Sequence, residues 1–454
     1  MSKKIILPDY VIDFMNTIRA SGHQIYLVGG AVRDILMERK TSNWDFATSA
    51  TPEQILSLFP KAFYHNPFGT VSIPMTHDQQ EQIFEVTPFR IDGNYQDHRH
   101  PDQVVWGSSL EEDVVRRDFT INAMATDGQD IVDMVGGAHD LKKGIIRCVG
   151  KPQDRFQEDA LRMLRAVRQA SQLCFTIEDE TKRAIREHAP LLKEISSERV
   201  RDELLKILGS EYPAEGILLM RETRLLDVVL PEVMECFGVE QKSPGRHHVD
   251  DVGTHLVKSL RFCTDPDPVT RLATLLHDIG KAKTVAVDPA TGTITFYNHE
   301  VVGARQAMEI AQRLCLSKKQ QHKLVTLVRY HMFSVSESQT DKALRRFISH
   351  VGIEYLDAIL ALRHADRRGS GVPDTSWRTE LFKKRLEEVQ KQPFTIHDLA
   401  IKGPDIMAFF SLPPSPTVGK IMKHLFRLVD DEQVPNTKDD LMRVLKTLDS
   451  ASFQ

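Results

Sequence analysis

Three oxygen-bearing side chains near the start of the chain could hold a divalent metal. In the predicted strand NWDFAT (43–48), Asn43 and Asp45 are two residues apart and point to the same face. Two carboxylates at such positions can bind two magnesium ions, which activate an attacking hydroxyl and stabilise a leaving pyrophosphate. Here one of the two is an amide. Glu85, in the predicted strand EQIFEVTPF (81–89), is a candidate for a further ligand, and an ordinary solvated strand residue is an equally good interpretation.

A glycine doublet before these residues could hold a phosphate. Gly29 and Gly30 end the predicted strand IYLVGG and precede the predicted helix AVRDILME. Paired glycines let a backbone approach a phosphate, and the helix N-terminus adds free N–H groups and the positive end of the helix dipole. A Gly-Gly turn alone is more often just a tight turn. The metal-ligating candidates in the next strand favour the phosphate interpretation.

A second group of candidate ligands lies in the later half of the chain. The segment RLATLLHDIGKAKT (271–284) places His277 and Asp278 near the end of an apolar helix, where buried polar groups need partners. Other predicted elements supply further candidates, namely His255, His299, His331 and Asp366. Imidazoles and carboxylates gathered from several helices suit a divalent metal that activates water for phosphoester hydrolysis. A histidine on an apolar face is more often a core residue, and this alternative applies above all to His331.

The elements that must position these residues change character along the chain. The first ~140 residues alternate short apolar strands with helices, as in an α/β or α+β domain. From about residue 155 nearly to the end, apolar residues recur at i, i+3 and i+4, which predicts helices such as ERVRDELLKIL (198–208). The sequence therefore predicts an α/β head on a long helical body.

Composition narrows the class of protein. At 454 residues the chain is long enough for two to four domains, and its hydrophobic (41%) and charged (27%) fractions are those of a soluble globular protein. No apolar run approaches the roughly 20 residues that cross a bilayer, and the start MSKKIILPDY lacks a signal-peptide cleavage site. We therefore expect a cytoplasmic protein without membrane contact. Its scattered cysteines indicate reduced thiols, and the basic clusters RMLRAVR and SERVRDELLK could contact a polyanion despite a net charge of −4.

Several of these segments together resemble the bacterial class II CCA-adding enzymes. In unbroken order over roughly the first 210 residues they are LVGGAVRDIL, NWDFATSATPEQI, FEVTPFRIDGNYQDHR, SLEEDVVRRDFTINAMA, DMVGG and FQEDALRMLRAVR. This family and the similar bacterial poly(A) polymerases are polymerase-β-like nucleotidyltransferases. The resemblance implies an α+β fold, whose head has a mixed sheet with helices and is followed by an all-helical body. It also implies template-independent addition of CCA to the 3′ end of tRNA, with CTP and ATP as donors, Mg²⁺ as cofactor and pyrophosphate released.

The resemblance also assigns roles to individual residues. It implies that Gly29, Gly30 and Arg33 hold the triphosphate and that Asp45 is a catalytic metal ligand, with Asn43 and Glu85 beside it. Further nucleotide contacts are implied for Arg116, Arg117, Asp118, Asn122, Glu158, Asp159, Arg162 and Arg165.

Asn43 departs from the family pattern, which is Asp-x-Asp. An amide oxygen can still coordinate magnesium, but it carries no charge and attracts the ion less than a carboxylate does. Three interpretations stay open: a natural slow enzyme that relies on Glu85, a polymerase site that has decayed, and an engineered inactive variant.

A predicted helix, EDALRMLRAVR, carries residues that could choose the base. Asp159 and Arg162, at i and i+3, would share one face of this helix. Cytosine and adenine both present an amine donor beside a ring-nitrogen acceptor, so an aspartate acceptor next to an arginine donor would take them and refuse uracil and guanine. The resemblance gives the EDxxR motif this role, and an exposed, salt-bridged helix is the alternative. The resemblance implies that a full-length flexible loop helps the switch from C to A addition. The loop RIDGNYQDHRHP is complete except that His100 stands where the family usually has arginine, and this favours addition of A, either after C or alone.

The segment HDIGK resembles the HD phosphohydrolase superfamily. This resemblance implies that His255, His277, Asp278 and Asp366 bind a divalent metal (Mg, Mn, Ni or Co), with His299 and His331 as second-metal or substrate contacts. We expect the other histidines nearby to be solvated, namely His247, His248 and His364.

The expected domains are a nucleotidyltransferase head (1–145), a helical neck for nucleotide selection and RNA binding (146–235), an HD domain (236–375) and a helical tail (376–454). The expected partners are tRNA, CTP and ATP. Three other functions stay open: a poly(A) polymerase or A-adding enzyme, an HD phosphohydrolase with a weakened head, and a non-catalytic tRNA-binding protein.

Overall fold

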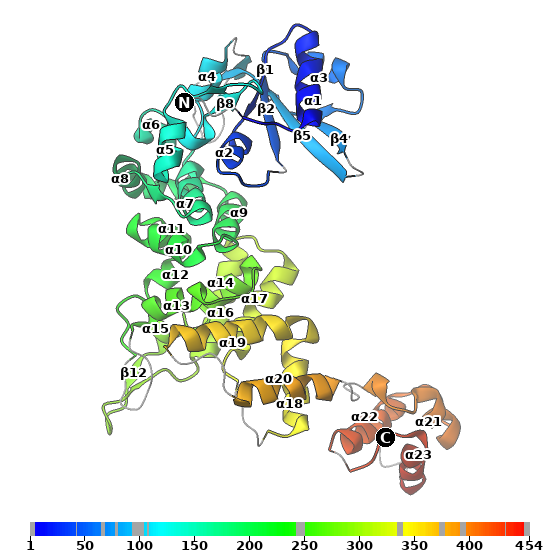
Figure 1. The fold of residues 1–454 in the computed structure, drawn as a ribbon. Coiled ribbons are helices and arrows are strands. Elements are labelled where there is room, and N and C mark those ends of the chain that lie inside the picture. The colour runs from blue at the N-terminus through cyan, green and yellow to red at the C-terminus, as the bar shows by residue number, and fades with distance from the viewer. Residues whose placement is uncertain are drawn as a thin grey trace.

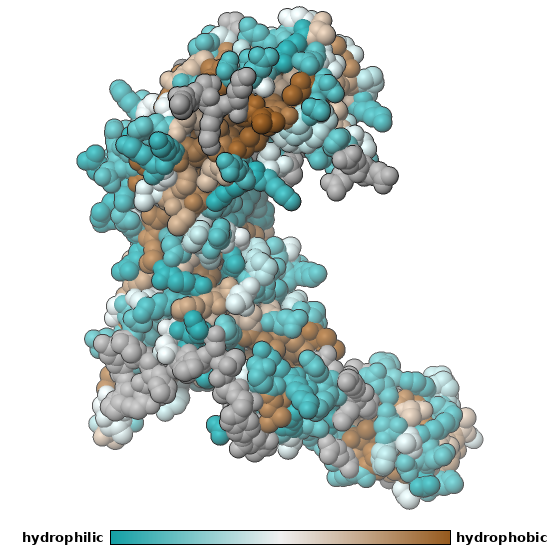
Figure 2. Space-filling model, in the orientation of Figure 1, coloured by the Kyte–Doolittle hydropathy of each residue, from teal (hydrophilic) through white to brown (hydrophobic). Residues whose placement is uncertain are grey.

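The chain folds into an arch with the head at one end and a small group of helices at the other (Figure 1). Figure 2 shows an open concave side between these two ends, and hydrophilic residues cover most of the visible face. No helix in the described part of the chain is long and apolar enough to cross a membrane. The computed structural model describes residues 5–41, 43–64, 69–77, 80–92, 104–106, 109–241, 250–333, 339–371, 377–390, 396–431 and 433–448.

The head is built on a seven-stranded sheet with the strand order β3-β4-β5-β2-β1-β8-β9. Its strands are β1 (Ile25–Val28), β2 (Trp44–Thr48), β3 (Phe63–Tyr64), β4 (Val71–His77), β5 (Gln80–Pro88), β8 (Ala125–Thr126) and β9 (Ile131–Val132). Strands β2 and β5 pair in parallel, and the other described pairs of this sheet are antiparallel. The predicted mixed sheet is therefore confirmed.

Alternation along β2 and β5 separates a buried face from a face that can do chemistry. Phe46 and Phe84 are buried with residues of α1 and α3 in one hydrophobic core. Asp45 precedes Phe46 in β2 and Glu85 follows Phe84 in β5, so both side chains belong to the other face of the sheet. The parallel register places them directly opposite each other. The remaining elements of the head are α1 (Asp9–Ala20), α2 (Gly30–Leu36), α3 (Pro52–Leu58), α4 (Leu110–Val115), α5 (Gly137–Lys143), η1 (Thr120–Asn122), β6 (Arg90–Asp92) and β7 (Val104–Trp106).

The body is helical, as predicted, and one continuous hydrophobic core extends through it from Phe119 to Val389. Its helices are α6 (Pro152–Glu158), α7 (Leu161–Leu173), α8 (Asp179–His188), α9 (Ser197–Leu208), α10 (Pro213–Glu222), α11 (Leu225–Val229), α12 (Pro231–Met234), α13 (Val252–Arg261), α14 (Pro268–Leu276), α15 (Lys281–Thr284), α16 (His299–Arg313), α17 (Lys318–Tyr330), α18 (Asp341–Val351), α19 (Leu356–Gly369) and α20 (Trp377–Gln390), with η2 (Ala189–Glu194) and η3 (Ile353–Tyr355). Short strands accompany them, namely β10 (Ile145–Ile146), β11 (Thr176–Ile177), β12 (Ala286–Val287) and β13 (Ile294–Thr295).

The C-terminal helices bury a separate core. They are η4 (Ile396–Asp398), α21 (Gly403–Phe410), α22 (Pro416–Asp430) and α23 (Lys438–Thr447). The five cysteines of the chain are free thiols, in agreement with the prediction.

One predicted helix is broken at the residue that was expected to read the base. Helix α6 ends at Glu158 and α7 begins at Leu161, whereas Asp159 is extended, with φ −146° and ψ 104°. Its Oδ1 accepts a hydrogen bond from Leu161 N at 3.0 Å, which satisfies a free N–H in the first turn of α7. The prediction that Asp159 and Arg162 share a face of one helix is therefore wrong.

Candidate functional site

The head and the neck together line a cavity of about 670 Å³. Of the residues singled out in the sequence, those that line it are Gly29, Gly30, Arg33, Asn43, Asp45, Glu85, Arg116, Arg117, Asp118, Asn122, Asp159, Arg162 and Arg165. Glu158 is adjacent to this set and pairs with Arg162 at 2.6 Å. The loop residues 93–103, which include His100, lie outside the described residues.

The glycine doublet forms the turn from β1 into α2 beside the carboxylates. Gly29 has φ 74°, a conformation that strains residues with a side chain. A Cβ at Gly29 would be 3.6 Å from both Asp45 Oδ2 and Arg117 Nη1. The backbone at Gly29 therefore lies next to both the Asp45 carboxylate and the Arg117 guanidinium, and the N-terminus of α2 adds free N–H groups for a phosphate.

Asp45 and Glu85 fit a divalent cation. Burial and the negative charge of Glu85 raise the pKa of Asp45 to about 6, and Arg117 opposes this rise. A bound cation would favour the ionised carboxylate, because an opposite charge stabilises it. Asn43 is exposed immediately before β2 and lines the same cavity. Two carboxylates and an amide oxygen are a donor set that suits magnesium.

Asp113, a residue that the sequence reasoning missed, orients two arginines of the cavity. Its fully buried carboxylate accepts from Arg116 Nε at Oδ1 and from Arg117 Nε at Oδ2, each at 3.0 Å. Burial opposes ionisation, but the two guanidinium groups lower the pKa of Asp113 below its ordinary value. The i+3 and i+4 spacing from Asp113 to this arginine pair was the available signal.

A hydrogen-bond network fixes the other predicted nucleotide contacts. Arg33 Nη1 donates to Asn122 Oδ1 at 2.9 Å and to Gln169 Oε1 at 2.8 Å. Arg165 Nε donates to Asp118 Oδ2 at 2.8 Å. Burial opposes ionisation of Asp118, but the charge of Arg165 outweighs it and the pKa falls to about 2. The network therefore stays charged at neutral pH.

The two expected base readers line the cavity, and their side chains bond to other residues, although the Arg162 backbone N–H donates to the Asp159 carbonyl at 3.0 Å. Asp159 Oδ2 accepts from Arg199 Nη2 at 2.8 Å, and Arg162 Nη1 donates to Glu158 Oε2 at 2.6 Å. Arg199 comes from α9, within a basic segment that the sequence indicated for polyanion contact. Further lining residues that were not predicted are Thr70, Thr87, Arg90, Arg168, Gln169 and Gln172.

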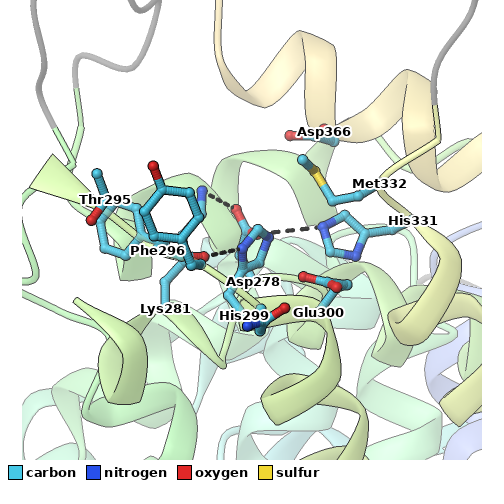
Figure 3. A pocket seen from close by; sticks show the side chains of 11 residues that line it. Asp278, Lys281, Thr295, Phe296, His299, Glu300, His331, Met332 and Asp366 are labelled. Carbon is cyan, nitrogen blue, oxygen red and sulfur yellow. Dashed lines mark hydrogen bonds and ion pairs between the residues drawn. The ribbon is translucent and has the colours of Figure 1, made fainter. Parts of the chain in front are cut away.

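The helical body contains the second cluster, which gathers all six predicted ligands. They form two groups, His255–His277–Asp366 and Asp278–His299–His331, and within each group the ligand atoms lie within 4.8 Å of one another. Figure 3 shows Asp278 at the centre, linked to Lys281, His299 and His331, with Asp366 across the cavity. Ligands from five helices or helix ends thus converge on one volume.

Backbone carbonyls orient three of these imidazoles. Nδ1 of His277, His299 and His331 lies 2.8 Å from the carbonyl oxygen of Thr274, Phe296 and Val328, respectively. A carbonyl oxygen only accepts, so Nδ1 carries a proton and each Nε2 faces the cluster, with a lone pair where the imidazole is neutral.

The lone pairs of His299 and His331 face a carboxylate. Their Nε2 atoms lie 3.2 and 3.5 Å from Asp278 Oδ1, and both are buried without a hydrogen-bond partner among the described residues. Two acceptors at this distance need a proton or a cation between them. The donor set of imidazoles and carboxylates fits a divalent transition metal.

The charges of the cluster are strongly coupled. Burial disfavours the charged form of His277, but Asp278 and Asp366 outweigh burial and raise its pKa to about 10. Burial likewise opposes ionisation of Asp278, yet Lys281, at 2.6 Å, and His277 hold its pKa well below the ordinary value. His364 is outside both groups and is half-buried, so the prediction that it is solvated is wrong. His247 and His248 lie outside the described residues.

Comparison with known families matches three parts of the chain. Residues 25–147 match the "Poly A polymerase head domain", residues 174–237 the "Probable RNA and SrmB- binding site of polymerase A", and residues 294–445 the "tRNA nucleotidyltransferase domain 2 putative". None of these three families is an HD domain, so the HD resemblance rests on the six ligands.

Three similar proteins extend the comparison. The A-adding tRNA nucleotidyltransferase of Deinococcus radiodurans is 34% identical over 417 residues, which are 88% of this chain and 90% of that protein. The CCA-adding enzyme of Geobacillus thermodenitrificans is 44% identical over 226 residues, but these are 49% of this chain and 55% of that enzyme. The crystal structure of the Bacillus stearothermophilus CCA-adding enzyme in complex with CTP has a TM-score of 0.71 and 28% identity, and the superposition covers 97% of this chain and 96% of that one. The chain therefore belongs to the family of tRNA nucleotidyltransferases that contains the CCA-adding and A-adding enzymes, with a polymerase-β-like head followed by a helical body.

Proposed function

We propose that this tRNA nucleotidyltransferase adds CCA to the 3′ end of tRNA, with CTP and ATP as donors. The observation that carries the proposal is the composition of one cavity. The parallel register brings Asp45 opposite Glu85, and Arg33, Arg116, Arg117 and the base readers line the same space. A triphosphate, a cation and a base therefore have complementary groups within about 670 Å³.

In the proposed reaction, the 3′ hydroxyl of the tRNA loses its proton to the solvent, and its oxygen forms a bond to the α-phosphorus of the nucleotide. The bond between the α-phosphorus and its bridging oxygen breaks, and pyrophosphate leaves. Arg33, Arg116 and Arg117 neutralise the charge that collects on pyrophosphate. Asp45 and Glu85, with the Asn43 amide, would hold magnesium, which when bound supplies Lewis-acid stabilisation of the attacking and leaving oxygens.

Base choice in this proposal depends on Asp159 and Arg162. Asp159 offers an acceptor to the exocyclic amine of cytosine or adenine, and Arg162 offers a donor to the ring nitrogen. Their partners Arg199 and Glu158 hold the two side chains in place before a nucleotide enters. Uracil and guanine present a donor where Arg162 also donates, so they are disfavoured.

Addition of A alone is the second candidate, and similarity to the Deinococcus A-adding enzyme over 88% of the chain favours it. The test uses magnesium, labelled CTP and ATP, and tRNAs that end before CCA, after C and after CC, with products resolved at single nucleotides. Addition of three, two and one nucleotides supports CCA addition. Extension of the CC-ending tRNA alone supports A addition, and a long A tail supports a poly(A) polymerase. If all three tRNAs bind and none is extended, both proposals fail.

We also propose that the six-ligand cluster hydrolyses phosphoesters. The main support for this proposal is that the buried Nε2 atoms of His299 and His331 both face Oδ1 of Asp278. When bound, the divalent metals would supply an activated water at neutral pH. Oxygen from that water bonds to phosphorus, the ester P–O bond breaks, and the leaving alkoxide takes a proton. Release of phosphate from glycerol 2-phosphate with Mg²⁺, Mn²⁺, Ni²⁺ or Co²⁺ tests this proposal, and no release with any metal contradicts it.

A further inference from the structure

The cavity above the six-ligand cluster is larger than its metal ligands require. It has a volume of about 450 Å³, and Asp278, His299, His331 and Asp366 line one part of it. Sites for small organic ligands occupy roughly 300–1,000 Å³. The cavity therefore has room for an organic group attached to the phosphate.

Two exposed apolar side chains form part of the cavity lining. Tyr297 is 78% exposed and Met332 is 65% exposed, and both line the cavity. Apolar and aromatic side chains that line a cavity beside polar groups are the usual composition of a small-molecule site. This pair therefore offers apolar surface to a group bound in the cavity.

The local backbone explains why Tyr297 faces outward. Its neighbour Phe296 is buried, and the Phe296 carbonyl accepts the Nδ1–H of the metal ligand His299. Asn298, between Tyr297 and His299, has a left-handed conformation with φ 61°. The metal-ligand geometry thus fixes the segment in which Tyr297 lies.

Met332 approaches the cavity from another element. It directly follows His331, which caps the C-terminus of α17. In Figure 3, Thr295 and Phe296 lie on one side of Asp278, and His331 and Met332 lie on the opposite side. The segment that carries Thr295 and Phe296 and the segment that carries Met332 both line the cavity.

We infer that Tyr297 and Met332 form a nucleobase subsite, so that the phosphoester presented to the metal ligands belongs to a nucleotide, either free or at an RNA end. This inference rests on the proposed phosphohydrolase function. A tyrosine ring stacks on the face of any base, and a thioether makes favourable contacts with an aromatic ring. Among the other lining residues, which include Lys281, Phe296 and Glu300, Thr295 and Asn298 offer polar contacts to the sugar or the base edge.

Steady-state hydrolysis by the metal-loaded full chain separates base recognition from chemistry. Guanosine 3′-monophosphate is the test substrate, because the base readers of the head should refuse guanine. Glycerol 2-phosphate is the comparison substrate, because it has the phosphate ester without a base. Tyr297→Leu should raise KM for the nucleotide about tenfold, as expected for one lost stacking contact. Its kcat and all constants for glycerol 2-phosphate should not change. Tyr297→Trp should restore KM, and Tyr64→Leu, at an exposed tyrosine in β3 of the head, is the matched control.

A binding measurement keeps the inference testable even if nothing is hydrolysed. Saturation-transfer NMR should detect contact between the protein and the base protons of guanosine 3′-monophosphate, and Tyr297→Leu should abolish it while Tyr64→Leu preserves it. Hydrolysis of glycerol 2-phosphate with no Tyr297 effect on either readout overturns the subsite alone. No hydrolysis of any ester overturns the phosphohydrolase proposal, and the NMR result then decides the subsite. A 3′-phosphorylated oligonucleotide with a lower KM than the free nucleotide would identify the RNA end as the source of the ligand.

Discussion

The two candidate metal sites of this chain are built on opposite principles. In the head, two carboxylates lie among many arginines. Asn43 stands where the family pattern Asp-x-Asp has a second carboxylate in the same strand as Asp45. In the helical body, six candidate ligands from five helices or helix ends surround one volume. Magnesium at a phosphoryl-transfer site takes part of its coordination from substrate phosphates, whereas a site made of imidazoles and carboxylates supplies its own donors. We therefore expect the head to depend on its substrate to complete a metal site, and the body not to.

This difference predicts that losing one ligand has different consequences at the two sites. At the head, the arginines should still hold a triphosphate when a carboxylate is missing. Loss of a carboxylate should therefore lower the reaction rate much more than nucleotide binding. In the body, the metals and the chemistry depend on the same ligands.

The largest effect should come from Asp45→Ala. This change removes the better buried of the two head carboxylates, and nucleotide addition should fall on the order of 1,000-fold, because several kcal/mol of charge stabilisation are lost. Primer-extension rates on tRNA measure the loss, and CTP binding by equilibrium dialysis should change far less. Equal losses in binding and rate would contradict the division between arginines and carboxylates.

His277→Ala tests the body by the same logic. Metal content and phosphoester hydrolysis should decline together, the rate by about 100-fold or more, while tRNA extension keeps its normal rate. Mass spectrometry of bound metals and phosphate release provide the two measurements. A variant that retains its metals yet cannot hydrolyse would show that the two properties are separable here as well.

Asn43→Asp should sharpen the comparison by restoring the missing charge. If the amide impairs an otherwise intact site, addition should rise at least about tenfold, since an anionic ligand stabilises the cation more than a neutral one. Single-turnover extension rates at saturating magnesium measure this, with Asn43→Gln as the uncharged control. An unchanged rate would mean that the head functions without the second strand carboxylate or is damaged elsewhere.

Asp159→Ala should alter which base is accepted. Loss of the acceptor should relax discrimination against UTP by about tenfold, in the range of one hydrogen-bonded base contact, with little change in tRNA affinity. Misincorporation assays with single nucleotides measure it. Arg199→Ala, which removes the partner at 2.8 Å, should have the same direction of effect. Unaltered selectivity in both variants would refute the assigned base readers.

The smallest effect concerns pH. The pKa of Asp45 is raised to about 6, so its carboxylate is mostly ionised at pH 7 and gains a proton as the pH falls through 6. A proton competes with magnesium, so lowering the pH from 7 to 6 should weaken magnesium binding about twofold. Calorimetric titration with magnesium at the two pH values checks this. In Asp45→Asn the titrating carboxyl is absent, and the difference should disappear.

Much of the head could be predicted from local pattern. The alternation in NWDFAT predicted one face for Asn43 and Asp45, EQIFEVTPF was a candidate neighbouring strand that carries Glu85, and β2 and β5 do pair as neighbours. The glycine turn and the six body ligands were also identified by residue type and spacing. These features depend on short-range periodicity, which a sequence displays directly.

Other features depended on contacts between distant segments. Asp159 leaves the helical conformation, although EDALRMLRAVR has helical spacing, because it caps α7 and binds Arg199 from α9. The spacing of Asp113 from Arg116 and Arg117 could have indicated these ion pairs, but the full burial of its carboxylate depends on distant segments. His364 was expected to be solvated, but its side chain on α19 is half-buried.

By itself, the sequence determined the order of strands and helices, the residues able to hold phosphate and metal, and the family resemblance, because all of these are properties of residue type and spacing. The tertiary structure alone decided that Asp45 pairs with Glu85, that α9 supplies the partner of Asp159, and that four histidines and two aspartates meet at one point. Each of these depends on the register of a sheet or the crossing of helices. Such long-range geometry is fixed by how the apolar faces pack together, and no single segment contains it.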